Sequence, residues 1–173
     1  MDIFKENKRY LLATIIMTVL AVAVNGFIIM QACLNGVRST ESSGFVVNLL
    51  KTIINGISPN AINDGNIDTF SYVIRKLVGH FGLFAISGLF STFSLYLWFR
   101  PQKCYKNYRL LYLSLGFGLL LAILTEIIQL FTPGRSGQFT DVLIDFSGFI
   151  LGNGIIILIL YLVYRHHKKK EEN

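Results

Sequence analysis

The sequence predicts an all-α fold: a polytopic membrane protein built as a small bundle of four transmembrane helices. Its composition is the first observation, because 53% of the 173 residues are hydrophobic and only 15% are charged, which is too apolar for a soluble globule of this length. The second is the presence of four apolar runs of about 20 residues or more, the length that spans a hydrocarbon core of about 30 Å. The third is the placement of Lys and Arg at alternate ends of those runs.

The basic residues explain the net charge of +6 without a nucleic-acid partner. They precede the first apolar run, separate the second from the third and follow the last, which is the pattern of positively charged cytoplasmic segments. We therefore expect a multi-pass protein of the cell membrane with both termini in the cytoplasm. The residues concerned are Lys5, Lys8 and Arg9, then Arg100, Lys103, Lys106 and Arg109, and finally Arg165 and Lys168 to Lys170.

Residues 11–30 form the first predicted transmembrane helix, after a cytoplasmic N-terminal segment of residues 1–10. The basic residues ahead of this run also fit a signal peptide, but the run is long and no cleavage site of small residues closes it. We expect an uncleaved anchor.

Residues 31–72 are rich in Asn, Gly and Ser and are predicted to form an outer loop. Within the loop, apolar residues recur at helical spacing between Phe45 and Ile57, which favours a short amphipathic helix. Such a helix would rest on the outer bilayer surface or cap the bundle. Simple packing against neighbouring helices explains the same pattern equally well.

Residues 73–164 contain the other three predicted spans. The second span runs from residue 73 to Phe99, and the third runs over residues 110–130. The fourth covers residues 139–164 and is followed by a basic cytoplasmic tail, residues 165–173.

Polar and ionisable side chains gather where the second, third and fourth spans reach the outer leaflet. Lys76 and His80 are four residues apart and share one helix face, and Glu126 lies about 7 Å below the interface by helical rise. Charges at that depth need partners or water, so they indicate a functional site. The candidate cluster is Lys76, His80, Glu126, Gln129, Arg135, Asp141 and Asp145.

The charges in this region balance. Arg75, Lys76 and Arg135 supply three positive charges against three carboxylates, and an uncompensated charge at membrane depth costs on the order of 3 kcal/mol. We expect these groups to pair and to neutralise one another. Gly148 and Gly152 share a helix stripe with the two aspartates, and their small size favours close helix packing.

The residues at the end of the third span resemble a motif of the VanZ-like family of small bacterial membrane proteins. The most specific part is the stretch Glu-x-x-Gln-x-x-x-Pro-Gly-Arg, and the similarity covers about residues 72–164. The family takes its name from a member associated with resistance to the glycopeptide teicoplanin in Gram-positive bacteria. The resemblance therefore implies a role in glycopeptide resistance or envelope homeostasis. The matching residues are Arg75-Lys76, Gly79-His80-Phe81, Thr125-Glu126, Gln129-Leu130-Phe131, Pro133-Gly134-Arg135, Asp141, Asp145, Gly148 and Gly152.

The candidate cluster is interpreted first as a recognition site. A polar pocket with Arg135 and the Pro133-Gly134 backbone at its mouth suits an anionic or hydrogen-bonding head group. Membrane lipids, a lipid-linked cell-wall precursor or a glycopeptide are the expected ligands, and no cofactor is expected.

Three alternatives stay open. His80 and the carboxylates include the types of general acid and base, and together they are candidate metal ligands for an enzyme that acts on a lipid-linked substrate. Catalysis and a metal site are less favoured, because the sequence contains no local metal-ligand or nucleophile motif. An ion path is disfavoured by the lack of charges in the inner halves of the third and fourth spans. The cluster also fits interhelical bridges with a purely structural role.

Overall fold

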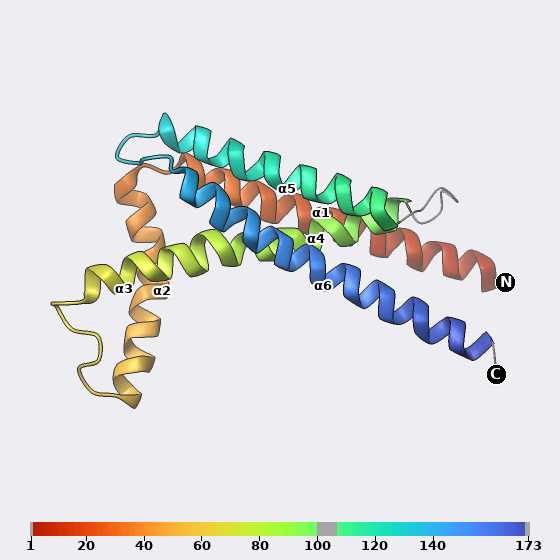
Figure 1. The fold of residues 1–173 in the computed structure, drawn as a ribbon, viewed down its shortest axis with the longest axis horizontal. Helices are drawn as coiled ribbons and strands as arrows, with labels where there is room; N and C mark the ends of the chain where they lie inside the picture. Colours follow the sequence, from red (N-terminus) through yellow and green to blue (C-terminus); the bar gives the residue numbers. More distant parts are fainter. Residues whose placement is uncertain (1, 100–106, 172–173) are drawn as a thin grey trace.

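The structure, a computed structural model, describes residues 2–99 and 107–171 and confirms the all-α bundle (Figure 1). Part of the basic loop expected between the second and third spans, residues 100–106, lies outside the described residues. Within the described residues, four helical stretches are long and apolar enough to cross a membrane. They are Lys8–Cys33, Ile67–Phe99, Arg109–Leu130 and Phe139–Lys170.

The helices follow one another with short connections. The helix that contains the second span begins at Ile67, and three helical segments run on from there without a break up to Phe99. In chain order the elements are α1 (Asp2–Cys33), α2 (Gly36–Ile57), α3 (Ile67–Ile74), the π-helix η1 (Arg75–Gly82), α4 (Leu83–Phe99), α5 (Asn107–Leu130) and α6 (Phe139–Glu171).

Helix α2 lies in the segment expected to be an outer loop, and it crosses the end of the bundle transversely (Figure 1). It begins at Gly36, where the side chain of Asn35 accepts a hydrogen bond from the backbone N–H of Arg38 at 2.9 Å, a regular N-terminal cap. One stripe of the helix is apolar and exposed, so α2 supplies the predicted amphipathic helix. The stripe consists of Val37, Phe45, Leu49, Ile53 and Ile57.

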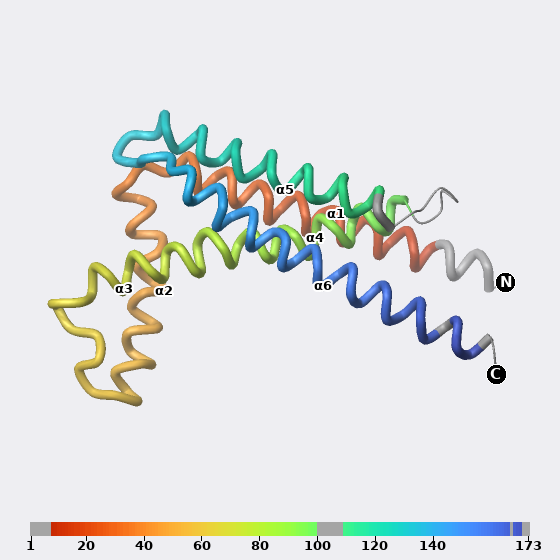
Figure 2. The backbone as a smooth tube through the Cα atoms, viewed as in Figure 1, coloured from red at the N-terminus to blue at the C-terminus, as the bar shows by residue number. Residues whose placement is uncertain are grey.

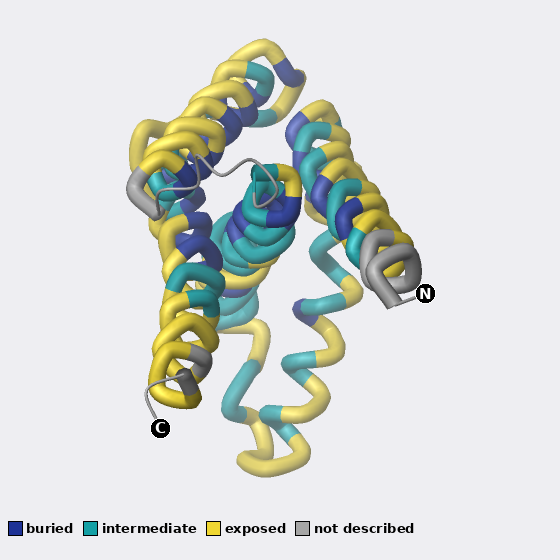
Figure 3. The backbone as a smooth tube through the Cα atoms, turned by 90° about the vertical axis from the view of Figure 1, so that its right-hand side faces the viewer, coloured by how far each residue is buried: buried dark blue, intermediate teal, exposed yellow. Residues whose placement is uncertain are grey.

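Helix α4 is the centre of the bundle and packs against α1, α5 and α6. The end-on view in Figure 3 shows the buried residues turned inward and the exposed residues turned outward. The outward side chains include Val22 and Leu120, which are both apolar. An apolar exterior of this kind suits contact with lipid chains.

The bundle interior combines apolar packing with hydrogen bonds between helices. Phe149 of α6 is fully buried and packs with Phe84 and Leu121. Nearby, the side-chain amide of Asn153 donates to the hydroxyls of Thr92 and Ser114, which joins α6 to α4 and α5. Such interhelical hydrogen bonds contribute about 0.6 kcal/mol each on average.

Gly148 and Gly152 lie where α6 meets the backbones of η1 and α4. A Cβ atom at Gly148 would come within 3.0 Å of the Phe81 carbonyl, and one at Gly152 would come as close to the Ala85 carbonyl. Only a residue without a side chain permits this approach, which brings the first half of α6 directly against the elements that carry Lys76 and His80.

The two ends of the bundle differ. The tube in Figure 2 shows the first part of α1 and the last part of α6 at one end, and α2, α3 and the α5–α6 turn at the other. The predicted polar cluster belongs to the second end, away from the basic termini.

Candidate functional site

Two neighbouring elements, η1 and α6, form the ion pairs of the site. The Lys76 Nζ atom pairs with Asp141 Oδ1, and His80 Nδ1 lies 3.0 Å from Asp145 Oδ1. The other ring nitrogen of His80, Nε2, lies 3.8 Å from Asp141 Oδ2. Lys76 and His80 therefore share one face of η1, and the two aspartates share the facing stripe of α6.

The π-helical turn sets the position of Lys76 and His80. In η1 the hydrogen bonds span five residues, as in the bond from the Leu83 N–H to the Val78 carbonyl. Segments of this type are rare and often occur at functional sites. The sequence predicts an ordinary helix here, and nothing in its pattern indicates the wider turn.

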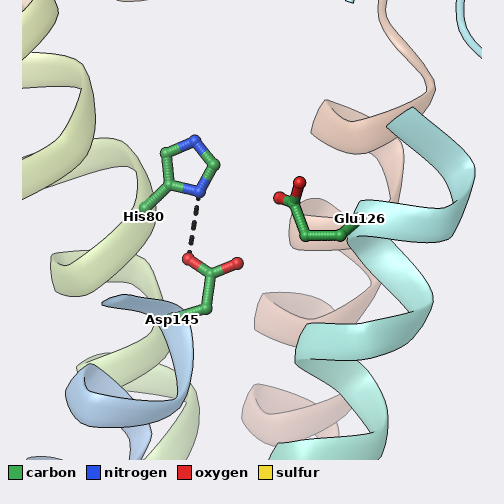
Figure 4. A group of neighbouring side chains, drawn as sticks. All are labelled: His80, Glu126 and Asp145. Atoms are coloured by element: carbon green, nitrogen blue, oxygen red, sulfur yellow. Dashed lines mark hydrogen bonds and ion pairs between the residues drawn. The ribbon is translucent and has the colours of Figure 1, made fainter. Parts of the chain in front are cut away.

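Glu126 of α5 is buried and points toward His80 and Asp145 (Figure 4). Its Oε2 atom accepts a hydrogen bond from the backbone N–H of Gln138 at 2.8 Å, which ties α5 to the residue just before α6. Its Oε1 atom and the Oδ2 atom of Asp145 are buried and have no hydrogen-bond partner among the described residues. Glu126 and Asp145 therefore each have one buried oxygen that can accept a further hydrogen bond or bind a cation.

Arg135 lies in the turn between α5 and α6, and its Nη1 atom donates a hydrogen bond to the Ser39 hydroxyl of α2. The turn is also tied to α2 by its backbone, because the Gly36 N–H donates to the Pro133 carbonyl at 3.0 Å. Gly134 has φ of +71°, in the left-handed region that glycine adopts without strain. The turn therefore holds the guanidinium over the end of the bundle.

Arg75 and Arg135 form no ion pair with a carboxylate among the described residues, whereas Lys76 pairs with Asp141. The mutual neutralisation expected for this region is therefore incomplete. Burial lowers the pKa of Arg135, and repulsion from Arg75 lowers it further, by more than the attraction of Glu126 or Asp141 raises it.

A cavity of about 230 Å³ lies beside these groups. Arg75, Arg135, His80, Gln129 and Asp145 contribute its polar lining. Gln31, Ser39, Ser42, Ser43 and Thr125 add uncharged polar groups, and most of the remaining lining is apolar. The cavity therefore combines charged groups with apolar surface. Its apolar lining includes Phe27, Ile28 and Ala32 from α1, Val46 from α2, and Leu83 and Phe84 from α4.

Comparison with known protein families matches residues 10–161 to the family described as VanZ/LLP1. The chain belongs to the VanZ/LLP1 family. The match begins within α1, whereas the motif similarity read from the sequence begins near residue 72. Neither the curated proteins nor the solved structures compared with the chain include a match.

All seven predicted cluster residues of this VanZ/LLP1 protein lie at the same end of the bundle, but they do not all pair with one another. Lys76 and His80 pair with Asp141 and Asp145, whereas Glu126 and Asp145 each keep one buried oxygen without a hydrogen-bond partner among the described residues. Gln129 and Arg135 belong to neither set and line the cavity.

Arg75 enters the charge balance predicted for this region but not the candidate cluster, and Ser39 is not assigned to the site from the sequence. Arg75 could have been included in the cluster, because it is charged and adjacent to Lys76. The sequence around Ser39 gives no indication that this residue bonds to Arg135 in the α5–α6 turn.

Proposed function

We propose that this VanZ/LLP1 protein binds the anionic head group of a lipid or lipid-linked molecule in the cavity at the end of its bundle. Through this binding it contributes to glycopeptide resistance or to envelope homeostasis. The observation that carries the proposal is the presence of two guanidinium groups, Arg75 and Arg135, on one cavity with no carboxylate partner among the described residues.

A phosphate or carboxylate is the natural partner of such a pair. Guanidinium groups present a planar fork of donors that matches these anions. Two half-buried cations that repel each other are unfavourable alone, and an anion between them converts the repulsion into attraction. The side-chain amide of Gln129, also on the cavity, adds a neutral hydrogen-bonding group.

A lipid-linked ligand fits better than a free anion because of the apolar lining. Residues such as Phe27, Leu83 and Phe84 contribute to it, and apolar lining of this extent favours the chain region of an amphiphile. The basic segments of the sequence favour a cytoplasmic location for the opposite end of the bundle. The cavity accordingly belongs to the outer leaflet, where cell-wall precursors and lipoglycopeptides meet the membrane.

Lipid binding can be measured with purified protein in nanodiscs of phosphatidylcholine. We expect the thermal midpoint to rise as phosphatidylglycerol or a polyprenyl phosphate is added, because a ligand that binds only the folded state stabilises it. Arg75→Gln and Arg135→Gln should remove most of the rise. Arg38→Gln is the matched control, since Arg38 is exposed on α2 and does not line the cavity.

The two additives distinguish the sources of the head group. A larger rise with phosphatidylglycerol indicates a bulk lipid, and a larger rise with the polyprenyl phosphate indicates a lipid-linked phosphate. Equal rises in all variants, or no rise in the unaltered protein, would exclude the guanidinium pair as the binding site.

The cellular role is tested by the inhibitory concentrations of teicoplanin and vancomycin in a sensitive Gram-positive host. Empty vector, the unaltered protein, Glu126→Gln and Arg135→Gln are compared at equal membrane levels. Teicoplanin carries an acyl chain that vancomycin lacks, so we expect a selective teicoplanin shift that both substitutions abolish. If the strain with the unaltered protein has the same inhibitory concentrations as the strain with empty vector, this protein does not confer glycopeptide resistance.

A further inference from the structure

Three potential metal ligands come together from three different helical elements. His80 of η1, Glu126 of α5 and Asp145 of α6 each offer one ligand atom, and these atoms lie within 4.8 Å of one another (Figure 4). With metal–ligand bonds of about 2.1 Å, adjacent ligands of one ion lie roughly 3.0 Å apart and opposite ligands roughly 4.2 Å apart. His80 Nδ1 and Asp145 Oδ1, which lie 3.0 Å apart in a hydrogen bond, already have the spacing of adjacent ligands, and a bound ion would replace the proton between them.

Two carboxylate oxygens without hydrogen-bond partners, Glu126 Oε1 and Asp145 Oδ2, indicate a cation site. Glu126 is 5% exposed and Asp145 is 1% exposed, and each has one oxygen without a hydrogen-bond partner among the described residues. Buried acceptors without donors are uncommon in folded proteins because leaving them unsatisfied is costly. A single ion between the two carboxylates satisfies both oxygens.

The charge count favours a divalent ion. Lys76 compensates Asp141 directly, so Glu126 and Asp145 leave two negative charges beside an imidazole that is neutral when it acts as a ligand. Neither carboxylate forms an ion pair with Lys or Arg within the described part of the chain. One divalent cation neutralises the group, which is the form in which membrane-buried charges are least costly.

Further groups are placed to orient the ligands. The Gln138 N–H holds Glu126 Oε2 at 2.8 Å, and Asp141 Oδ2 lies 3.8 Å from the His80 Nε2 atom. In metal sites, the ring nitrogen of a histidine that does not bind the metal usually donates a hydrogen bond to a carboxylate, and another polar group holds that carboxylate. Here Lys76 holds that carboxylate.

We propose that His80, Glu126 and Asp145 bind one divalent transition-metal cation, Zn²⁺ or Mn²⁺. One imidazole with two carboxylates suits these ions better than Mg²⁺ or Ca²⁺, which prefer oxygen ligands alone. Because His80 and Asp145 also line the cavity, the ion faces the space that Arg75 and Arg135 enter. The metal site is distinct from the proposed head-group site, since neither Arg75 nor Arg135 is among its three ligands.

Metal binding is tested on the full-length protein in detergent, stripped with a chelator and then dialysed against Zn²⁺, Mn²⁺, Mg²⁺ or Ca²⁺. Bound metal is counted by elemental mass spectrometry, and affinity is measured by competition with a chromophoric chelator. We expect about one Zn²⁺ or Mn²⁺ per chain. Glu126→Gln, Asp145→Asn and His80→Ala should each weaken binding by at least about tenfold, the loss that even outer groups produce.

Asp68→Asn is the matched control, because Asp68 is an exposed carboxylate on α3 and lies outside the cluster. It should bind metal as the unaltered protein does. Circular dichroism and size-exclusion chromatography verify that each variant is folded, and Glu126→Gln retains the shape and the acceptor for Gln138. Absence of stoichiometric metal in the unaltered protein would overturn the site. So would equal affinity in folded Glu126→Gln and Asp145→Asn.

The two proposals fail separately. Arg135→Gln is expected to lose the phosphatidylglycerol response while keeping its metal, because Arg135 does not belong to the three ligands. If the unaltered protein binds no metal and metal-free Glu126→Gln has a higher thermal midpoint, the two carboxylates share a proton instead. That outcome overturns the metal site and leaves the guanidinium pair unaffected.

Discussion

At the level of single residues, the contact between Lys76 and Asp141 has the clearest energetic consequence. Asp141 is 4% exposed, and its removal leaves the Lys76 ammonium without its carboxylate in a largely buried position. Breaking a buried pair from one side costs about 3 kcal/mol or more. We expect Asp141→Asn to lower the thermal midpoint in detergent clearly.

A second substitution in the same protein shows whether the unpaired charge is the cause. Lys76→Met combined with Asp141→Asn removes both charges and should recover part of the loss, since two neutral groups need no counterion. A double variant that is as unstable as the sum of the single variants would indicate that the two residues act independently.

Arg135→Lys separates charge from geometry. Lysine keeps the positive charge but lacks the planar fork that holds an anion through two parallel hydrogen bonds. We expect the phosphatidylglycerol-dependent rise in thermal midpoint to become smaller than in the unaltered protein but to exceed that of Arg135→Gln. A response equal to that of the unaltered protein would mean that charge alone recruits the head group.

The sequence predicts which residues gather but not how they pair. The spacing of Asp141 and Asp145 is sufficient to place them on one helix stripe, and the α5–α6 turn is sufficient to bring Glu126 near them. The choice of Lys76 over Arg75 or Arg135 as the partner of Asp141 depends on the direction of long side chains in a π-helical turn. No periodicity of apolar residues contains that information.

At the level of elements, the packing of α6 on α4 depends on Gly152. A methyl group there would lie within 3.0 Å of the Ala85 carbonyl and the Leu89 nitrogen, both of which are backbone atoms that cannot move aside alone. Overpacking of this type costs about 1–3 kcal/mol. We therefore expect Gly152→Ala to lower the thermal midpoint and to weaken metal binding, because α6 carries Asp145.

Gly154→Ala is the control for that substitution. It lies two residues further along α6, and nothing lies within 4 Å of a Cβ atom placed there. Alanine also favours the helix over glycine by about 0.5–1 kcal/mol, so this variant should be as stable as the unaltered protein or slightly more so. Similar losses in both variants would show that helix α6 tolerates no change there for reasons other than contact with α4.

The spans could be predicted from hydropathy because apolar length is a property of the chain itself. The exact ends of the helices could not be predicted from hydropathy. The helix of the second span, for example, starts at Ile67. The residues before 73 are mixed in polarity and become helical because the turn ahead of them is held by asparagine side chains, among them Asn55, which bonds both backbone groups of Ile62. Helix α2 likewise starts at Gly36, before Phe45, because the Asn35 side chain caps its N-terminus there.

At the level of the whole molecule, orientation is open to direct measurement. The proposed topology places Cys33, an exposed residue at the end of α1, on the outer side of the membrane. With Cys104→Ser as background, a membrane-impermeant maleimide added to intact cells should label Cys33. Labelling that occurs only after the membrane is permeabilised would reverse the orientation and would move the cavity to the cytoplasmic leaflet.

The transverse course of α2 connects the cavity to the thickness of the surrounding bilayer. The exposed apolar residues of α2 favour a position at the bilayer interface, while Ser39 of the same helix is bonded to Arg135 of the α5–α6 turn. A bilayer with shorter or longer acyl chains changes the distance between its two surfaces, and membrane proteins adapt to such mismatch at a modest cost per ångström. That adjustment would move α2 against the bundle and change the spacing of the groups that enclose the cavity. The acyl-chain length of the host membrane should therefore change the affinity of this VanZ/LLP1 protein for the proposed lipid ligand, even when the head groups around it stay the same.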